Sequence, residues 1–198
     1  SSAVAAMRLD HDGITGWKSW FLFDEVVVAL GSGISAPSAG QPVYTTLNQS
    51  IANTDATYSQ LSAEVDLSPG QSAELNGAAW VWQDNIGYIL PEGNDSALVD
   101  VATVSGSWAD LGTAGDVAVE EDVFTLALDH GANPSGASYS YMILPDYRKD
   151  DTAAFAANPT VDILANTGEV QAVRDTVSGK IGVAFLQAGA EVELPDGT

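Results

Sequence analysis

Residues 14–34 read ITGWKSWFLFDEVVVALGSGI, a stretch dominated by aromatic and β-branched side chains. Such residues favour extended backbone, so we expect a strand over Ile14–Leu30. The preceding segment Ala3–Leu9 is also strand-like, and the Asp12-Gly13 dipeptide between the two favours the positive φ of a two-residue hairpin turn. A low-hydrophobicity disordered chain is excluded, because 45% of the residues are hydrophobic and only 17% are charged. The sequence therefore predicts a globular protein that begins with an antiparallel hairpin.

The rest of the chain repeats this pattern, with period-two or short continuous apolar runs separated by glycine-bearing turns. We therefore predict an all-β protein built from antiparallel strands. Asn76-Gly77 predicts a second hairpin, between Ala73–Leu75 and Ala78–Trp82. Further strands are expected at Val43–Asn48, Ile86–Leu90, Leu98–Val104, Val123–Asp129, Ser138–Leu144, Val161–Leu164, Glu169–Arg174 and Ile181–Leu186.

Helix is expected in one short stretch, Asp151–Ala157. Asp151 or Thr152 can cap this alanine-rich turn, and Pro159 stops it. The segment 145–159 also brings the first basic residues after a long gap, so we place a boundary there. We predict one domain over residues 1–157 and a second over residues 158–198.

The charge of the chain is strongly acidic. Its 198 residues include 6 Lys and Arg against 27 Asp and Glu, which gives a formal net charge of -21. Between Lys18 and Arg148 there is no basic residue, whereas seventeen acidic residues fall in that stretch. We therefore expect neither nucleic acid nor an anionic membrane surface as a partner. The acidity fits either a saline or calcium-rich medium, or a surface that never meets polyanions.

Three further features of the composition narrow the classes. The absence of Cys excludes disulfide scaffolds, zinc ribbons and thiol nucleophiles. No apolar run reaches the roughly 18 residues that a membrane span needs. The sequence starts at Ser1 without an initiator Met or a signal peptide, so we expect a mature or trimmed product.

Motifs for catalysis and cofactor binding are sparse. His11 lies in Asp10–Gly13, which offers ligands to a cation but lacks the rest of a calcium-binding loop, so a polar turn is the better interpretation. Gly31–Gly33 follows an apolar strand as in dinucleotide-binding folds, but the third glycine and the helix are missing. No G-x-S-x-G occurs that would indicate a serine nucleophile. The acidic stretch Glu120–Asp122 fits a calcium site or, better, a solvated strand entrance.

Two residue groups are candidates for a site. His130 adjoins an acid in Asp129-His130-Gly131, where we favour a structural turn with hydrogen bonds from the imidazole to backbone carbonyls over a general base. Aromatic residues alternate along two strands, so each pair shares a face and can form either core or a platform that stacks on sugar rings. The candidate sugar-binding residues are Trp80, Trp82, Trp108, Tyr139 and Tyr141.

Taken together, these motifs resemble those of polysaccharide lyase family 8, the hyaluronate, chondroitin AC and xanthan lyases. The segments that carry the resemblance, in the order in which that family shows them, are Trp17–Asp24 with Val28–Ile34, Thr45-Thr46 with Gln49, Gly87–Pro91, Gly106–Trp108, Asp129–Gly131 with Pro134, Tyr139–Pro145, and Gln171–Val173 with Ala184-Phe185. The resemblance spans nearly the whole chain, and the shared order is more specific than any single segment.

The resemblance implies a fold that is only part of such an enzyme. The family has an N-terminal α/α toroid, a central super-sandwich of antiparallel sheets and a small C-terminal sandwich. This chain is similar to the last part of the super-sandwich over residues 1–157, followed by the start of the final sandwich over residues 158–198. The family cleaves uronic-acid polysaccharides by β-elimination with residues of the toroid, so no catalytic residue can be assigned here.

We therefore expect the chain to be the β scaffold of a secreted, extracellular polysaccharide lyase and to be inactive alone. Its expected partners are the helical toroid and, through that domain, an acidic polysaccharide. The alternatives are a non-catalytic carbohydrate-binding sandwich and a structural β domain of a saline-adapted protein. We expect no required cofactor, although calcium would suit the acidic composition, with ligands that the sequence does not identify.

Overall fold

The computed structural model describes residues 2–38, 40–61, 63–110, 112 and 115–194. The first strands are β1 (Ala3–His11), β2 (Ile14–Leu22), β3 (Val27–Ser35), β4 (Pro42–Ile51), β5 (Ala56–Gln60), β6 (Ala63–Leu67), β7 (Gln71–Leu75), β8 (Ala79–Gln83) and β9 (Ile86–Leu90). They are followed by β10 (Ala97–Ser107), the 3-10 turn η1 (Trp108–Asp110), β11 (Ala118–Ala132), β12 (Ala137–Pro145), the helix α1 (Lys149–Ala157), β13 (Val161–Asn166), β14 (Val170–Asp175) and β15 (Ile181–Phe185).

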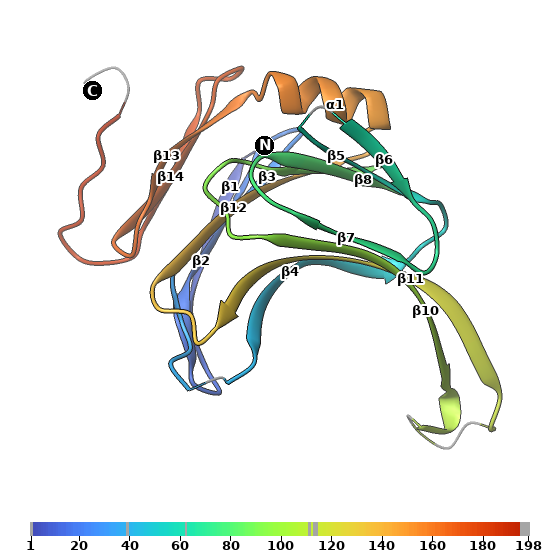
Figure 1. The fold of residues 1–198 in the computed structure, drawn as a ribbon. Helices are drawn as coiled ribbons and strands as arrows, with labels where there is room; N and C mark the ends of the chain where they lie inside the picture. Colours follow the sequence, from blue (N-terminus) through green and yellow to red (C-terminus); the bar gives the residue numbers. More distant parts are fainter. Residues whose placement is uncertain (1, 39, 62, 111, 113–114, 195–198) are drawn as a thin grey trace.

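Two antiparallel sheets form the main sandwich. The larger has eight strands in the order β1-β2-β3-β12-β9-β8-β5-β6, and the smaller has four in the order β4-β11-β10-β7. The small sheet curves beneath part of the large one (Figure 1), and apolar side chains fill the space between them. The fully buried side chains of this core include Val99, Phe124 and Leu126 on the small sheet and Tyr88 and Leu90 on the large one. The predicted all-β antiparallel fold is confirmed.

The first predicted hairpin is confirmed, with one correction. β1 pairs with β2 around Asp12 (φ 49) and Gly13 (φ 79), which take the left-handed conformation that this turn requires. The apolar stretch Ile14–Leu30, however, is not one strand. It folds back at Asp24-Glu25, where the Phe23 N–H donates to the Val26 carbonyl over 2.9 Å, so β2 and β3 form a second hairpin.

The predicted hairpin across Asn76-Gly77 is wrong. β7 pairs with β10 in the small sheet, whereas β8 pairs with β5 and β9 in the large one. The physical reason lies in burial, because Ala79–Val81 is covered on both faces and belongs inside a sheet, while β7 alternates as an edge strand does. Gly77 (φ 80) thus carries the chain from one layer to the other. β5 and β6 were not predicted.

The helix begins two residues earlier than predicted, at Lys149. Neither Asp151 nor Thr152 caps it, since the N-cap is Arg148 without a side-chain cap, and Thr152 Oγ1 instead donates to the Arg148 carbonyl over 3.0 Å. α1 packs on the outer face of β8 and β9. Gly87 permits this approach, because a Cβ there would lie 2.4 Å from Thr152 Oγ1.

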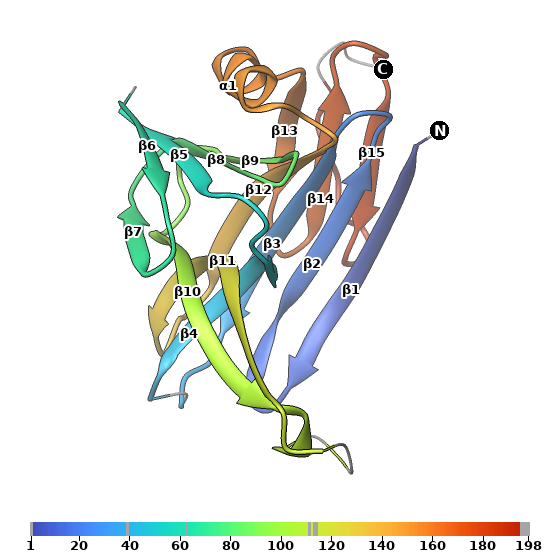
Figure 2. The ribbon, with the colours of Figure 1, turned by 90° about the vertical axis from the view of Figure 1, so that its right-hand side faces the viewer.

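A third sheet, β13-β14-β15, packs on the outer face of the strands β1–β3 (Figure 2). Phe21, Leu30 and Val173 belong to one apolar cluster that joins the two sheets. Buried Gln171 adds polar contacts, because its Oε1 accepts a hydrogen bond from Ser19 and its Nε2 donates to Asn166 Oδ1 over 2.8 Å. The predicted boundary between residues 157 and 158 stays a prediction, and it falls at the end of α1.

Among the described residues, no helix combines the length and the apolar character needed to cross a bilayer.

Candidate functional site

Tyr139 and Tyr141 of β12 lie inside the sandwich, with 3% and 6% of their surface exposed. Their rings stack with centroids 5.8 Å apart at an interplanar angle of 21°. Gly31 lies against Tyr139, because a Cβ at this glycine would be 2.0 Å from the ring carbon Cε1. Burial raises the pKa of both tyrosines. Gly31 thus makes room for a core aromatic ring, and these two rings offer no free face in this structure.

His130 has side-chain partners on both ring nitrogens. Nδ1 lies 3.1 Å from Asp95 Oδ2, and Nε2 lies 2.9 Å from Thr45 Oγ1. The imidazole also stacks on Tyr139 with a centroid distance of 5.8 Å. The predicted hydrogen bonds from the His130 ring to backbone carbonyls are therefore wrong, because both ring nitrogens contact side chains. The strand β11 continues through His130, so the ring points into the space between β4 and the β9–β10 loop, where Thr45 and Asp95 supply the polar groups.

The residues on either side of His130 lie within β11 rather than in the predicted turn, and the pairing of β11 with β4 changes register between Asp129 and Ala132. Gly131 has a φ of 70°, which a side chain would disfavour. Its N–H donates to Asp129 Oδ1 over 2.7 Å. Asp129 and Gly131 therefore shape the backbone, while His130 ties two strands and a loop together.

The order Asp95, His130, Thr45 matches the carboxylate, imidazole and hydroxyl of a nucleophilic triad. A reactive triad must meet its substrate, but only 1% of the His130 side chain is exposed and Thr45 is 6% exposed. Both groups are closed off within the sandwich. The arrangement therefore acts as a structural link, in which His130 joins β11 to β4 within the small sheet and to the β9–β10 loop through Asp95, which is 49% exposed.

Trp80 and Trp82 share the outer face of β8, beneath α1. Trp82 is partly buried, and its Nε1–H donates to the Tyr147 carbonyl over 2.8 Å. Trp80 is 7% exposed and lines a recess of about 630 Å³ between the large sheet, α1 and β13. Ala156 and Val161 are among the apolar residues on the opposite wall of this recess.

Trp108 is the most exposed of the five candidate aromatic residues, at 57%. It begins η1, at the end of a two-stranded extension of β10 and β11 that we call the arm, residues 102–110 and 118–122. The small sheet narrows before the arm, because the pairing of β7 ends at Val101 and that of β4 ends at Val123. Figures 1 and 2 show the arm projecting from the body of the sandwich.

The two candidate metal-binding stretches, around His11 and over Glu120–Asp122, are not joined by enough further ligands to form a metal site within the described residues. His11 Nε2 lies 3.1 Å from Asp12 Oδ2 on an exposed turn, and Asp122 accepts a hydrogen bond from Thr103 Oγ1 over 2.6 Å. Within the described ranges, no group of three or more His, Asp and Glu residues is arranged to hold a metal ion. Calcium binding stays an expectation without assigned ligands.

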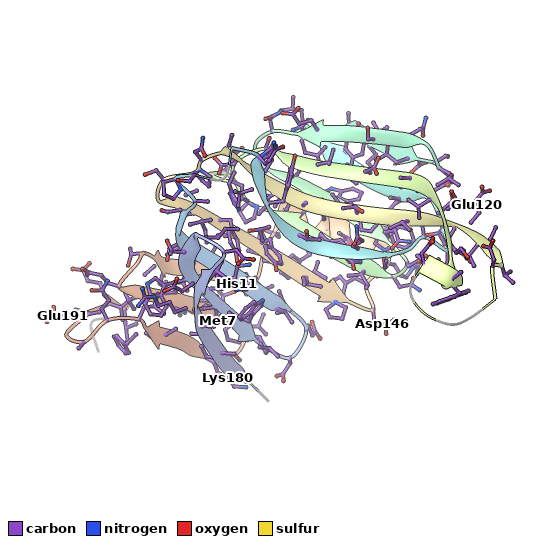
Figure 3. All side chains as sticks on the ribbon, turned by 90° about the horizontal axis from the view of Figure 1, so that it is seen from below. Met7, His11, Glu120, Asp146, Lys180 and Glu191 are labelled. Carbon is purple, nitrogen blue, oxygen red and sulfur yellow. The ribbon has the colours of Figure 1, made fainter. Side chains whose placement is uncertain are left out.

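The large sheet has a partly exposed face at its β1 edge, which we call the open side. β1 is an edge strand, and the face it shares with Lys18 and Leu22 is exposed at Met7 (45%) and Leu22 (40%). Figure 3 shows Met7 and His11 along this strand. Lys18 Nζ lies 6.0 Å from the Tyr139 ring centroid, and burial lowers the pKa of Lys18. Within the described part of the chain, no carboxylate forms an ion pair with this ammonium group.

Comparison with known proteins accounts for this fold. A family model described as polysaccharide lyase family 8, super-sandwich domain, matches residues 1–156. The chain belongs to polysaccharide lyase family 8. The match ends within α1, one residue before the predicted boundary, and it includes both main sheets.

Similar proteins of this family are larger than the chain. A xanthan lyase from Bacillus sp. (strain GL1) is 35% identical over 180 residues, which cover 85% of this chain and 19% of that enzyme. A chondroitinase-AC from Pedobacter heparinus is 32% identical over 187 residues, covering 94% of this chain and 26% of that enzyme. The chain thus spans about a fifth to a quarter of the length of these curated relatives.

Solved structures agree with the sequence comparison. A Paenibacillus xanthan lyase superposes with a TM-score of 0.87 at 30% identity, over 98% of this chain and 20% of that one. A chondroitinase AC lyase, solved in complex with oligosaccharides, gives a TM-score of 0.86 at 31% identity, over 96% of this chain and 28% of that one. The super-sandwich architecture implied by the sequence resemblance is therefore confirmed.

Sequence reasoning missed the partners of the buried polar residues. Thr45 and Asp95 lie 85 and 35 positions from His130, and Gln171 lies 152 positions from Ser19. Local patterns carry no signal for such contacts. The resemblance did single out Thr45, His130 and Gln171 as parts of family motifs. In the structure Thr45 bonds to His130 within the small sheet, His130 stacks on Tyr139 of the large sheet, and Gln171 joins the third sheet to β2.

Proposed function

We propose that this chain is the β-sandwich scaffold of a secreted polysaccharide lyase that cleaves uronic-acid-containing polysaccharide by β-elimination. The catalytic helical part would belong to a portion of the enzyme outside this chain. The observation that carries the proposal is the match of residues 1–156 to the super-sandwich domain of a lyase family. The aligned chain covers only 19% of the xanthan lyase and 26% of the chondroitinase-AC, so most of each enzyme lies outside the matched part. An extracellular location follows from the same proposal, because a polysaccharide substrate does not cross the cell membrane.

The scarcity of basic residues in this chain supports a catalytic site in another part of the enzyme. Elimination next to a uronate carboxylate needs a cation or amide to neutralise the carboxylate and a base near the proton that is removed. This chain has no basic residue between Lys18 and Arg148. Three of its six basic residues already pair with acids, in Arg8–Asp10, Lys149–Glu64 and Lys180–Asp24.

The open side of the large sheet supports an attachment to further polypeptide. The edge strand β1 leaves backbone groups free for another strand, and exposed Met7 and Leu22 offer apolar contact beside it. Lys18 on the same face would gain from an acidic partner, since its charge is partly desolvated without one. A scaffold that continues into a larger enzyme would cover this side.

A comparison of two proteins tests the proposal. The chain alone and a longer polypeptide that includes the residues preceding Ser1 are assayed on hyaluronan, chondroitin and xanthan for unsaturated uronate ends. We expect activity only in the longer protein. Met7→Glu, which places a charge on the covered open side, should lower the stability of the longer protein. An inactive longer protein on all uronate polymers would reject the proposal.

A further inference from the structure

We infer that the outer face of the arm is a binding site for a short run of uncharged sugar rings, with Trp108 as the stacking platform. The choice of a polysaccharide as ligand rests on the proposed function. The site itself is distinct from the open side of β1 and from the recess beneath α1.

Hydrogen bonds of Ser107 hold the backbone on either side of Trp108 at the end of the arm. Ser107 Oγ donates to Asp116 Oδ1 over 2.9 Å and accepts from the Ala109 N–H over 3.1 Å. These contacts tie the start of η1 to the chain that leads into β11. The exposed indole is therefore carried on a turn that is held at its backbone, so a ligand that stacks on Trp108 does not have to order the turn itself.

Two shallow grooves share Val104 in their linings, one on the outer face of the arm and the other where the arm meets the end of β4. One has a volume of about 250 Å³ and is lined by Val104, Ser105, Gly106, Ser107, Trp108, Val119 and Glu121. The other has a volume of about 380 Å³ and is lined by Gln49, Ser50, Ile51, Val104 and Val123. We call this pair of grooves the outer track.

The register of the strands explains why the outer track is apolar. Val101 pairs with Phe124, and both side chains point into the core with no exposed surface. Val104 pairs with Glu121 and Gly106 pairs with Val119, so these residues stand on the opposite face of the ribbon. Ile51 and Val104 remain 54% and 45% exposed there.

The shape of the outer track suits a linear sugar chain better than a protein. Strands in a sheet lie about 5 Å apart, so a two-stranded ribbon is narrow, whereas a stable protein interface buries roughly 800 Å² on each partner. Two adjoining grooves in line can each receive sugar rings. The C–H face of a sugar would lie on Trp108 and Val104, while its hydroxyls would meet polar groups such as Glu121 and Gln49.

The acidic residues around the outer track favour an uncharged ligand over an anionic one. Asp110, Asp116, Glu120 and Glu121 surround the end of the arm, and Figure 3 shows Glu120 on it, far from the basic residue Lys180. The nearest residues in sequence with positive charge are Lys18 and Arg148, on other strands or loops. A uronate or a nucleic acid would be repelled, whereas carboxylates accept hydrogen bonds from neutral hydroxyls.

Gly106 gives the sharpest test. A Cβ at this position would meet nothing within 4 Å, and no left-handed φ is required. Gly106→Leu therefore fills the groove beside Trp108 without a clash in the fold. Trp108→Ala removes the platform itself. Phe185→Ala is the matched control, because Phe185 is an aromatic residue of β15 that is 61% exposed and remote from the arm.

The experiment titrates the full chain and these variants with cellohexaose, a neutral β-linked oligosaccharide, by calorimetry and by NMR shifts of indole N–H groups. We expect weak binding by the parent and Phe185→Ala, and a loss of about tenfold or more for Trp108→Ala and Gly106→Leu with unchanged melting temperatures. A hyaluronan hexasaccharide should bind more weakly at low salt, and the difference should narrow as salt is added.

Two outcomes would overturn the inference. The first is the absence of cellohexaose binding by the parent chain, or binding that both arm variants retain. The second is self-association of the parent that Trp108→Ala abolishes, without sugar binding, since this would assign the arm to a protein contact. Either result leaves the scaffold proposal intact, because that proposal is judged by β-elimination activity and needs no sugar on the arm.

Discussion

His130 connects the small sheet to the β9–β10 loop and to a tyrosine of the large sheet. Its ring nitrogens lie within hydrogen-bond distance of Asp95 and Thr45, and its ring stacks on Tyr139. His130→Ala would leave the Thr45 hydroxyl without its partner and open a cavity, so we expect a loss of about 2–4 kcal/mol in the free energy of unfolding. Urea denaturation measures this change, and cellohexaose affinity should be unaffected.

The other histidine provides the control for this variant. His11 lies on the exposed turn between β1 and β2, and its side chain is 79% exposed. His11→Ala should change stability by less than about 0.5 kcal/mol. Equal losses for both histidines, or loss of ligand affinity without loss of stability in His130→Ala, would contradict a structural role.

Gly31 tests the tightness of the core. An alanine Cβ would lie 2.0 Å from Tyr139 Cε1, so the ring and its stacking partners must shift. We expect Gly31→Ala to destabilise the protein by about 1–3 kcal/mol or more, as overpacking does. Gly106→Ala serves as the control, because open space surrounds its Cβ position. Similar melting temperatures for the two variants would show that the Tyr139 ring can move at no cost.

At the scale of the elements, Gln171 decides how firmly the third sheet is held. Its amide contacts Ser19 of β2 and Asn166 of β13 in a fully buried position. Gln171→Leu would leave both partners unsatisfied, with an expected cost of about 2–3 kcal/mol. Hydrogen exchange should then rise first in β13–β15.

Gln187 is a matched amide for comparison, since it is exposed and its side-chain Nε2 donates to the Gly168 carbonyl over 3.1 Å. Gln187→Leu should leave exchange in β13–β15 almost unchanged. If Gln171→Leu raised hydrogen exchange evenly over the whole chain, the third sheet would unfold together with the sandwich. Residues 158–198 would then not be a separate unit of stability.

Local sequence patterns predicted several elements because those elements depend on local contacts. Asp12-Gly13 fixes a two-residue turn by its own backbone preference, and the hairpin of β1 and β2 follows. Asn76-Gly77 carries the same preference, but burial of Trp80 and Val81 on opposite faces placed β8 in the other sheet. A dipeptide specifies a turn, whereas the sheet that a strand joins depends on the whole layer.

The candidate site shows the same limit. Alternation correctly places Tyr139 and Tyr141 on one face of a strand, since their rings stack. It does not say whether another layer covers that face, and the small sheet does cover it. Trp108 is exposed because β4 and β7 end before the arm, which is a property of neighbouring strands far away in sequence.

At the scale of the whole molecule, self-repulsion among carboxylates should weaken the fold. The net charge of -21 opposes compaction, and salt shortens the range of this repulsion from about 30 Å at 0.01 M to about 3 Å at 1 M. We expect the melting temperature to rise with sodium chloride. Chloride is preferable to sulfate, which also strengthens apolar burial. A flat or falling melting temperature would reject repulsion as a dominant effect.

We propose that the chain supports a polysaccharide lyase whose catalytic residues lie in another part of the enzyme. The most direct measurement is the ultraviolet absorbance of unsaturated uronate when the purified chain is incubated with hyaluronan, chondroitin or xanthan. We expect no rise above the rate without protein, because the polyanion meets an acidic surface and His130 is enclosed. A clear rise that His130→Ala abolishes would place catalysis in this chain and contradict the account.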